Sequence, residues 1–328
     1  MKHLLAITDP GCAASTRYRV TQFEDFFKSR GVQMEVIPCP REKSEIARLL
    51  DAVKLADVVV IQRFLPRPAL FKQLRRHARR LVYDFDDAVI YAESAQRKSR
   101  LKLRRWWRFR RVLRDCDTVT AGNAYLAGLA SIHAGEGRVF TVPTVVDVNR
   151  YEHEPTPAAT APILGWIGGR WTLPYLEQLS QPLTALAAAH PDLYVRIIAD
   201  ELPKLHPLRL SLSPWSETTE IRDLKSLTIG LAPLPDDSWT RGKCGLRLLQ
   251  YLAAGIPAVA APVGTQADII RHGAALSAST DEEWRSATHQ LLTQPHAAAA
   301  LVARGKEVVR KHYSLATWAP RLFDLWCG

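Results

Sequence analysis

The sequence lacks a long apolar run. No stretch approaches the roughly 20 apolar residues that a membrane-spanning helix needs, and the opening MKHLLAITDPGC has too short an apolar run for a signal peptide. The five cysteines are scattered and odd in number, without the paired spacing of a zinc site or a disulfide framework. We therefore expect a protein of the reducing cytoplasm that is soluble or peripheral to a membrane.

Acidic residues are scarce relative to basic ones. The chain has 33 Asp and Glu against 44 Lys and Arg, a net charge of +11, which calls for an anionic partner. Acids are absent from RKSRLKLRRWWRFRRVLR, Arg97 to Arg114, where Trp106, Trp107 and Phe109 interrupt ten cations. Such a segment is typical of a helix on an anionic membrane, where each cation contributes about 1 kcal/mol. The alternatives are a solvated helix with its aromatics in the core and a nucleic-acid arm. We expect this segment to bind an anionic membrane surface, at the inner face of the plasma membrane. We expect no nucleic-acid partner.

Short apolar runs alternate with stretches of helix length along the whole chain. This alternation predicts parallel, doubly wound α/β sheets, and 328 residues suffice for two of them. A Pro- and Ala-rich segment at 152–162 predicts a linker. The predicted strands are 4–8, 32–38, 57–62, 80–85, 117–122 and 138–143 in the first half, and 163–169, 193–199, 208–213, 227–234 and 258–264 in the second.

The stretch TRGKCGLRLLQYLAAGIPAVAAPVG, residues 240–264, places cations around the start of a predicted helix that ends at Gly255. Cations there are unfavourable unless an anion compensates, because a helix N-terminus carries partial positive charge. Lys243, Arg247 and Gln250 share one predicted face. Open parallel sheets bind ligands at the carboxyl ends of their strands, so the pattern predicts a diphosphate site. An ordinary amphipathic helix with one wet face is the alternative.

The segment GKCGLRLLQYLAAGIPAVAAPVG resembles the signature of the retaining glycosyltransferases of family 4, also called glycosyl transferases group 1, which have the GT-B fold. The likeness extends over nearly the whole chain and rests on weaker pieces in the right order. These are STRYRVTQF, VYDFDDAV, AGNAYLA, VPTVVDVNRY, GWIGGRWTLPYLEQL and HYSLATWAPRLFDLW.

The resemblance implies an α/β protein with two Rossmann-like domains facing a central cleft. Residues 1–151 would bind the acceptor, residues 163–305 would bind the nucleotide sugar, and a helix at 306–328 would pack back toward the first domain. It further implies a metal-independent, retaining hexosyltransferase of polysaccharide biosynthesis. The donor would be a UDP- or GDP-type sugar, with no other cofactor, and the acceptor the hydroxyl of a lipid-linked or other cell-surface glycan precursor.

Two other functions stay open at this point. A GT-B epimerase or phosphorylase would use the same fold and phosphate site without an added acceptor. A non-enzymatic membrane or nucleic-acid binding protein would rest on the basic segment alone and would leave the predicted diphosphate site unexplained.

The chain departs from the family's pattern of two glutamates eight positions apart. Gln250 stands where the ribose-contacting glutamate is expected, and an amide carbonyl still accepts a hydrogen bond from a ribose hydroxyl. Gly242 stands at the other position, where the family contacts the transferred sugar. Asp236 or Asp237 is a candidate substitute, although turn residues that cap the following segment are an equally good interpretation.

The resemblance also assigns the remaining site residues. Glycines let a backbone approach a phosphate closely, and a tryptophan loop after a strand would hold the nucleobase, although a buried structural tryptophan is an alternative. The implied donor-binding residues are Gly168, Gly169, Trp215, Ser216, Arg247, Gln250, Gly264 and Thr265. The implied catalytic residues are Lys243, Arg170, Asp237 and Asp86. The implied acceptor-binding residues are Gly11, Ser15, Thr16, Arg17, Asp84 and Asp87.

The carboxylates Asp84, Asp86 and Asp87 are spaced closely enough to suggest a metal site. Enzymes of the resembled family generally need no metal, because cations and a helix dipole stabilise the leaving diphosphate. We therefore expect no metal ion. No residue presents itself as a nucleophile, so the resemblance implies a same-face displacement in which a leaving phosphate oxygen helps to deprotonate the acceptor.

Overall fold

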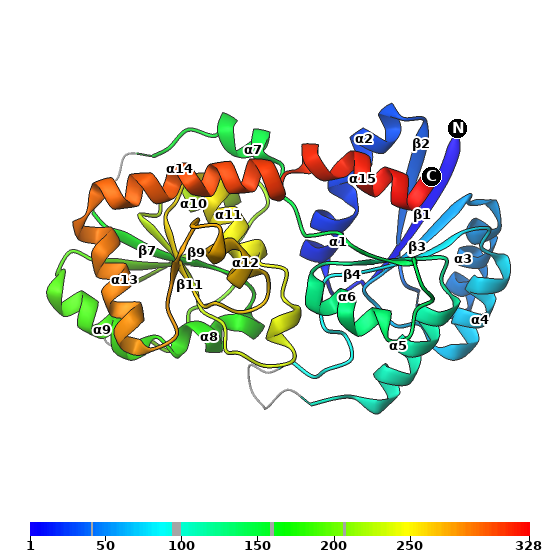
Figure 1. Cartoon of the computed structure of the whole chain (residues 1–328), viewed down its shortest axis with the longest axis horizontal. Coiled ribbons are helices and arrows are strands. Elements are labelled where there is room, and N and C mark those ends of the chain that lie inside the picture. The colour runs from blue at the N-terminus through cyan, green and yellow to red at the C-terminus, as the bar shows by residue number, and fades with distance from the viewer. Residues whose placement is uncertain (41, 94–99, 158–160, 206–207) are drawn as a thin grey trace.

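The computed structural model describes residues 1–40, 42–93, 100–157, 161–205 and 208–328. The chain folds into two lobes, each built on a parallel sheet of six strands with helices packed around it (Figure 1). Along β1 (Lys2–Thr8) the side chains of Leu5 and Ile7 join one core cluster, and those of Leu4 and Ala6 join another. Both faces of the sheet are therefore covered, which explains why its strands are continuous apolar runs. The predicted α/β architecture of two doubly wound domains is confirmed.

The first domain has the strand order β2-β1-β3-β4-β5-β6. Its other strands are β2 (Val32–Pro38), β3 (Val58–Gln62), β4 (Leu81–Phe85), β5 (Thr118–Ala121) and β6 (Val139–Thr141). Its helices are α1 (Ala13–Arg19), η1 (Thr21–Phe23), α2 (Glu24–Ser29), α3 (Lys43–Leu55), α4 (Pro68–His77), α5 (Leu103–Asp115) and α6 (Ala124–Ser131), and α7 (Val148–His153) leads to the second domain.

The second domain has the strand order β12-β11-β10-β7-β8-β9. Its strands are β7 (Ile163–Ile167), β8 (Tyr194–Ile198), β9 (Leu210–Ser213), β10 (Ile229–Ala232), β11 (Ala258–Ala260) and β12 (Leu276–Ser277). Only β12 lies outside the ranges predicted from the sequence, because two residues are too few to form a pattern. The helices are η2 (Arg170–Thr172), α8 (Leu173–Glu177), α9 (Ser180–Ala189), α10 (Glu220–Lys225), η3 (Thr240–Gly242), α11 (Leu246–Ala254), α12 (Thr265–Arg271), α13 (Asp281–Thr293) and α14 (Pro295–His312).

The last helix, α15 (Leu315–Cys327), lies on the first domain, and both chain termini end there (Figure 1). Leu322 and Trp326 pack in the same core cluster as Phe27. Helix α14 before it packs on the second domain, where Val308 and Val309 join the core around α11. The chain therefore crosses back between α14 and α15, and the boundary predicted between residues 305 and 306 falls inside a continuous helix.

A loop of the second domain, residues 235–245, docks on the first domain. Trp239 and Cys244 belong to the apolar core of the first domain. The side-chain amide nitrogen of Asn123 donates to the carbonyl oxygens of Arg241 and Lys243, at 3.1 and 3.2 Å. This packing holds the strand-end loops of the two domains against one another.

Candidate functional site

A cavity of about 410 Å³ lies between the strand-end loops of the two domains. The first domain contributes the start of α1 and the loops after β3 and β4. The second contributes the loop after β7 and the start of α11. The lining residues are Ala13, Ala14, Ser15, Tyr18, Arg63, Asp86, Asp87, Thr144, Ile167, Gly168, Gly169, Thr172, Asp200, Trp215, Glu220, Leu234, Lys243, Cys244, Gly245, Leu246, Arg247, Gln250 and Gln266. We call this cavity the interdomain cleft.

Lys243, Arg247 and Gln250 all line the interdomain cleft, as their spacing predicts. The prediction that Lys243 shares a helix with the other two is wrong, because α11 begins at Leu246. Gly245 takes the left-handed conformation, with φ of 72°, and separates the extended backbone at Lys243 from the helix. That conformation favours glycine, because a side chain is strained there.

Lys243 forms an ion pair with the first domain across the cleft. Its Nζ lies 2.9 and 3.1 Å from the two carboxylate oxygens of Asp87 and 4.5 Å from the centroid of the Trp239 ring. Asp87 is buried and also accepts a hydrogen bond from Arg63. A carboxylate of the first domain therefore neutralises the cation.

Arg63 follows β3 with φ of 70°, and no other non-glycine residue in the described part of the chain has a positive φ. Such strain persists only where the surroundings impose it, and it clusters at functional sites. The guanidinium contacts both Asp86, at 3.5 Å, and Asp87. Arg63 is not among the site residues predicted from the sequence. The signal that points to it is a cation directly after the buried strand VVVIQ.

Asp86 faces the first-domain side of the cleft. It accepts a hydrogen bond of 2.7 Å from the hydroxyl of Ser15, which in turn accepts one of 2.7 Å from the side-chain amide of Gln62. Two predicted site residues, Ser15 and Asp86, are thus brought together at the N-terminal turn of α1.

Asp84 does not line the cleft, contrary to its predicted contact with the acceptor. It is fully buried within β4 and forms a bidentate ion pair with Arg19, which is buried as well. The hydroxyl of Thr120 donates to the same carboxylate at 2.6 Å. Burial alone would lower the pKa of Arg19, but the charge and hydrogen bonds of Asp84 outweigh it and raise that pKa above its ordinary value. This carboxylate is a structural ion-pair partner.

Arg247 is a cation in the cleft without a carboxylate partner within ion-pair distance among the described residues. Its Nε donates to the carbonyl oxygen of Ile167, one Nη lies 3.3 Å from the hydroxyl of Thr172, and its guanidinium lies over the Trp166 ring. Burial lowers the pKa of Arg247 from its ordinary value, because the opposing influence of Tyr251 and Tyr175 is too weak to compensate for the loss of water. A bound anion would supply that compensation.

Gly168 allows Arg247 to reach this position. A Cβ added at Gly168 would lie 2.5 Å from an Nη of Arg247 and 2.7 Å from the Trp166 ring, whereas one added at Gly169 would meet open space. The two glycines thus leave room for the guanidinium and for exposed backbone beside it.

Gln250 uses only part of its hydrogen-bonding capacity within the protein. Its amide nitrogen donates to the Tyr18 hydroxyl at 3.1 Å, and this hydroxyl donates to Glu220 at 3.0 Å. The carbonyl oxygen of Gln250 therefore stays available as an acceptor. Glu220 was not selected by the sequence analysis, although it ends the stretch SPWSETTE after β9.

Gly242 cannot be replaced by a side chain in this arrangement. A Cβ there would lie 2.7 Å from the Cβ and 2.8 Å from the backbone nitrogen of Ala88 in the first domain. The docking of the 235–245 loop therefore explains why no carboxylate occupies this position.

Asp236 and Asp237 have partners outside the cleft and do not take the sugar-contacting position predicted for them. Asp236 forms an exposed ion pair with Arg241 at 2.6 Å. Asp237 accepts hydrogen bonds from the backbone nitrogens of Trp239 and Thr240, at 2.8 and 3.0 Å. Neither residue lines the cleft, so the turn-capping interpretation describes what they do in this structure.

The predicted catalytic residue Arg170 and three predicted donor-binding residues lie outside the cleft lining. Arg170 is exposed, with its guanidinium 4.5 Å from the Trp171 ring centroid, and the Ser216 hydroxyl lies 2.8 Å from that of Thr218. A Cβ added at Gly264 would lie 2.9 Å from the carbonyl oxygen of Arg241 and 3.0 Å from that of Lys243, and the buried Thr265 has its backbone nitrogen 3.4 Å from the same Lys243 oxygen. Gly264 and Thr265 therefore pack against the loop that carries Lys243.

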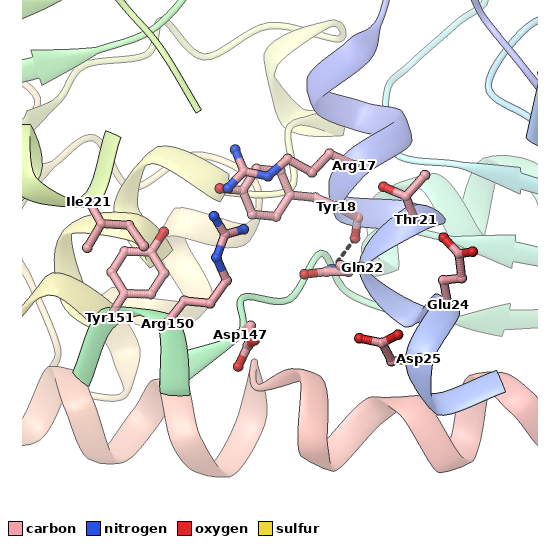
Figure 2. Close-up of a pocket in the computed structure, with 10 residues that line it drawn as sticks. All are labelled: Arg17, Tyr18, Thr21, Gln22, Glu24, Asp25, Asp147, Arg150, Tyr151 and Ile221. Atoms are coloured by element: carbon pink, nitrogen blue, oxygen red, sulfur yellow. Dashed lines mark hydrogen bonds between the residues drawn. The ribbon is translucent and has the colours of Figure 1, made fainter. Parts of the chain in front are cut away.

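Three predicted acceptor residues, Gly11, Thr16 and Arg17, also do not line the cleft. Arg17 lines a second cavity of about 230 Å³ at the junction of α1, α7 and α10 (Figure 2). There it lies across the ring of Tyr18 and pairs with Glu217 and Glu220, at 3.1 and 3.2 Å. Its charge therefore serves the contact between the domains.

The described residues contain no group of three His, Cys, Asp or Glu side chains arranged to hold a metal ion. The three aspartates of the predicted cluster turn to different partners. Asp84 pairs with Arg19, Asp86 with Ser15, and Asp87 with Lys243.

Helix α5 carries residues 103–114 of the basic segment, residues 100–102 precede the helix, and residues 97–99 lie outside the described residues. Phe109, Val112 and Leu113 are buried against the first domain, whereas Leu103 is 66% and Trp107 60% exposed. The helix therefore presents apolar side chains among its arginines on the outer surface. No helix in the described ranges has the length and apolar character needed to cross a bilayer.

The chain is similar to known proteins both in part of its sequence and in its fold. Residues 221–324 match the family model described as Glycosyl transferase-like, and a search of curated proteins gives no significant match. Similar solved structures include Anabaena HepE in complex with UDP and glucose, with a TM-score of 0.72, 12% identity and 99% of each chain covered. A glycosyltransferase from Rickettsia africae has a TM-score of 0.74, 12% identity and coverage of 99% of this chain and 97% of that chain.

WaaG, a glycosyltransferase involved in lipopolysaccharide biosynthesis, has a TM-score of 0.70 and 12% identity over the full length of both chains. At such low identity the likeness establishes the fold. The GT-B architecture that the sequence predicts, with two Rossmann-like domains facing a central cleft, is therefore confirmed.

Proposed function

We propose that this protein is a glycosyltransferase that moves a sugar from a nucleoside diphosphate sugar to an acceptor hydroxyl. The observation that carries the proposal is Arg247, a cation without a carboxylate partner in the described structure, which lines the interdomain cleft with Lys243. Two cations around a helix start and a glycine loop suit a diphosphate. The match of residues 221–324 to a Glycosyl transferase-like model and the UDP bound by the similar HepE structure support this choice of ligand.

The main catalytic contribution in this proposal is stabilisation of the leaving diphosphate. Lys243 would exchange Asp87 for a phosphate oxygen, and Arg247 would bind a second one from the loop after β7. Fixed charges in a cleft shielded from water stabilise developing charge more strongly than water does. No metal ion is needed in this scheme, because the two cations neutralise the leaving group.

The acceptor would bind on the first-domain side of the cleft. Asp86, which contacts Ser15 and Arg63, would accept a hydrogen bond from an acceptor hydroxyl. A leaving phosphate oxygen would then take the proton of that hydroxyl as the new glycosidic bond forms on the same face of the sugar. The donor is of UDP or GDP type in this proposal, and the acceptor is a lipid-linked or other cell-surface glycan precursor.

Retention of the anomeric configuration is the expected outcome of that same-face displacement. Proton NMR of the first product formed from an α-linked nucleotide sugar should show an α linkage, and the rate should be unchanged after treatment with EDTA. A β-linked product would overturn the mechanism. Loss of activity on chelation, restored by a divalent ion, would instead point to a metal at the aspartates after β4.

We also propose that helix α5 places the cleft at an anionic membrane, at the inner face of the plasma membrane. Lys102 directly precedes the helix, which carries Arg104, Arg105 and Arg108 together with the exposed ring of Trp107. Arginines attract anionic headgroups within a Debye length of roughly 8 Å, and tryptophan rings sit at the headgroup level. A lipid-linked acceptor would then reach the first domain from the bilayer surface.

Sedimentation with anionic liposomes at low salt is expected to carry the wild-type protein down, and added salt should release it. Replacing Lys102, Arg104, Arg105 and Arg108 with glutamine should abolish sedimentation and leave nucleotide binding intact, because none of these four residues lines the interdomain cleft. The matched control is replacement of Arg222, Arg271, Arg285 and Arg304 with glutamine, which likewise removes four positive charges, here from exposed side chains of the second domain. A wild-type protein that does not sediment with anionic liposomes would contradict this proposal. So would a control variant whose sedimentation falls as much as that of the test variant.

A further inference from the structure

Glu220 is a buried carboxylate on which side chains from both domains converge. Its Oε2 accepts a hydrogen bond of 2.8 Å from the indole nitrogen of Trp215, in its own domain. Its Oε1 accepts one of 3.0 Å from the Tyr18 hydroxyl and lies 3.2 Å from an Nη of Arg17, both in the first domain. A buried charge is tolerated when it is paired and hydrogen-bonded, so these donors account for the position of Glu220.

Trp215 lines the interdomain cleft and is 41% exposed. Its one polar group, the indole N–H, donates a hydrogen bond to Glu220. What Trp215 can offer to a ligand is therefore its aromatic ring. Stacking on a nucleobase is the interaction for which such a ring is suited, because every base has an apolar face.

The hydroxyl of Tyr18 links Glu220 to Gln250. Burial, reinforced by the charge of Glu220, raises the pKa of Tyr18, so its hydroxyl stays protonated and donates to Glu220. The same hydroxyl accepts the amide hydrogen of Gln250. This contact fixes the orientation of the Gln250 amide and leaves its carbonyl oxygen for a ribose hydroxyl.

We propose that Glu220 is a positioning residue that sets recognition of the nucleoside end of the donor. It fixes Trp215 for the base and, through Tyr18, the amide of Gln250 for the ribose. The inference rests on the proposed function and extends it. Because Tyr18 and Arg17 belong to the first domain (Figure 2), the nucleoside is recognised fully only when the two domains lie as they do in this structure.

Calorimetric titrations with UDP, GDP and pyrophosphate test this role. Pyrophosphate carries the diphosphate but neither base nor ribose. Glu220→Gln should weaken the better-bound nucleotide about tenfold, the scale of one hydrogen bond to a charged group, and leave pyrophosphate binding unchanged. Trp215→Phe keeps a ring but removes the N–H and should have a similar effect. Since Glu220→Gln already breaks the contact that Trp215→Phe removes, the double variant should bind no more than about threefold more weakly than Glu220→Gln alone.

Glu217→Gln is the matched control. Glu217 also pairs with Arg17, at 3.1 Å, but it is half-exposed and does not line the cleft. This variant should bind all three ligands as the wild type does. Unchanged nucleotide affinity in Glu220→Gln, equal weakening of pyrophosphate, or additive effects in the double variant would overturn the inference. A wild type that binds neither nucleotide nor pyrophosphate would instead overturn the proposed function.

Discussion

Replacement of Lys243 with alanine is expected to lower the rate of sugar transfer by about 10²–10³-fold, the usual effect of removing one group that stabilises developing charge. Lys243 lines the interdomain cleft, and its ammonium is held there by Asp87 of the first domain. In the proposed reaction, its loss removes a cation from the leaving diphosphate. Asp87 keeps its contact with Arg63, so the variant does not leave that carboxylate unpaired. Initial rates with the donor that binds in calorimetry measure the effect.

Arg241→Ala is the matched control for Lys243. Arg241 lies two residues earlier in the same loop, and its side chain pairs with Asp236 on the surface, outside the cleft. Its backbone carbonyl, which accepts a hydrogen bond from Asn123, is unaffected by the substitution. This variant should retain wild-type rates within a factor of about three, since exposed ion pairs contribute little. Equal losses in the two variants would show that general disruption of the loop, and not the charge at Lys243, is responsible.

Asp84→Ala is expected to lower the free energy of unfolding by about 3–5 kcal/mol, because it leaves the buried guanidinium of Arg19 without its counterion. Thermal or denaturant unfolding measures the loss. Replacing both partners, as Arg19→Met with Asp84→Leu, should recover part of it, since an apolar pair carries no unpaired charge.

The same variant separates the two roles considered for Asp84. As a structural ion-pair partner, Asp84 affects stability. As an acceptor ligand, it would affect the KM for the acceptor and leave unfolding unchanged. An Asp84→Ala protein of wild-type stability with a raised acceptor KM would therefore restore the assignment made from the sequence.

Most of the fold could be predicted because parallel strands that are buried on both faces consist of continuous apolar runs in the sequence. All eleven predicted strands are present, and the one missed, β12, has two residues. The start of α11 was misplaced because the sequence does not reveal which glycine of GKCGL takes a left-handed conformation. Gly245 does so, and Lys243 therefore lies outside the helix.

The candidate site was partly predictable for a related reason. Residues directly after strand ends reach the cleft, as do Asp86 and Asp87 after β4 and Gly168 and Gly169 after β7. Which partner each side chain takes depends on distant segments. Asp84 lies inside a strand and meets Arg19 from α1, and Glu220 meets Tyr18 from the other domain. No local spacing encodes those contacts.

The central claim is that the interdomain cleft binds a nucleoside diphosphate between Lys243 and Arg247. Calorimetric titration of the wild type and of Lys243→Ala with UDP and GDP tests it most directly. We predict that one of the two nucleotides binds the wild type with one site per chain and that Lys243→Ala weakens it at least about tenfold, the scale of a lost charge-assisted contact. Absence of binding of both nucleotides to the wild type, or equal affinity in the variant, would contradict the claim.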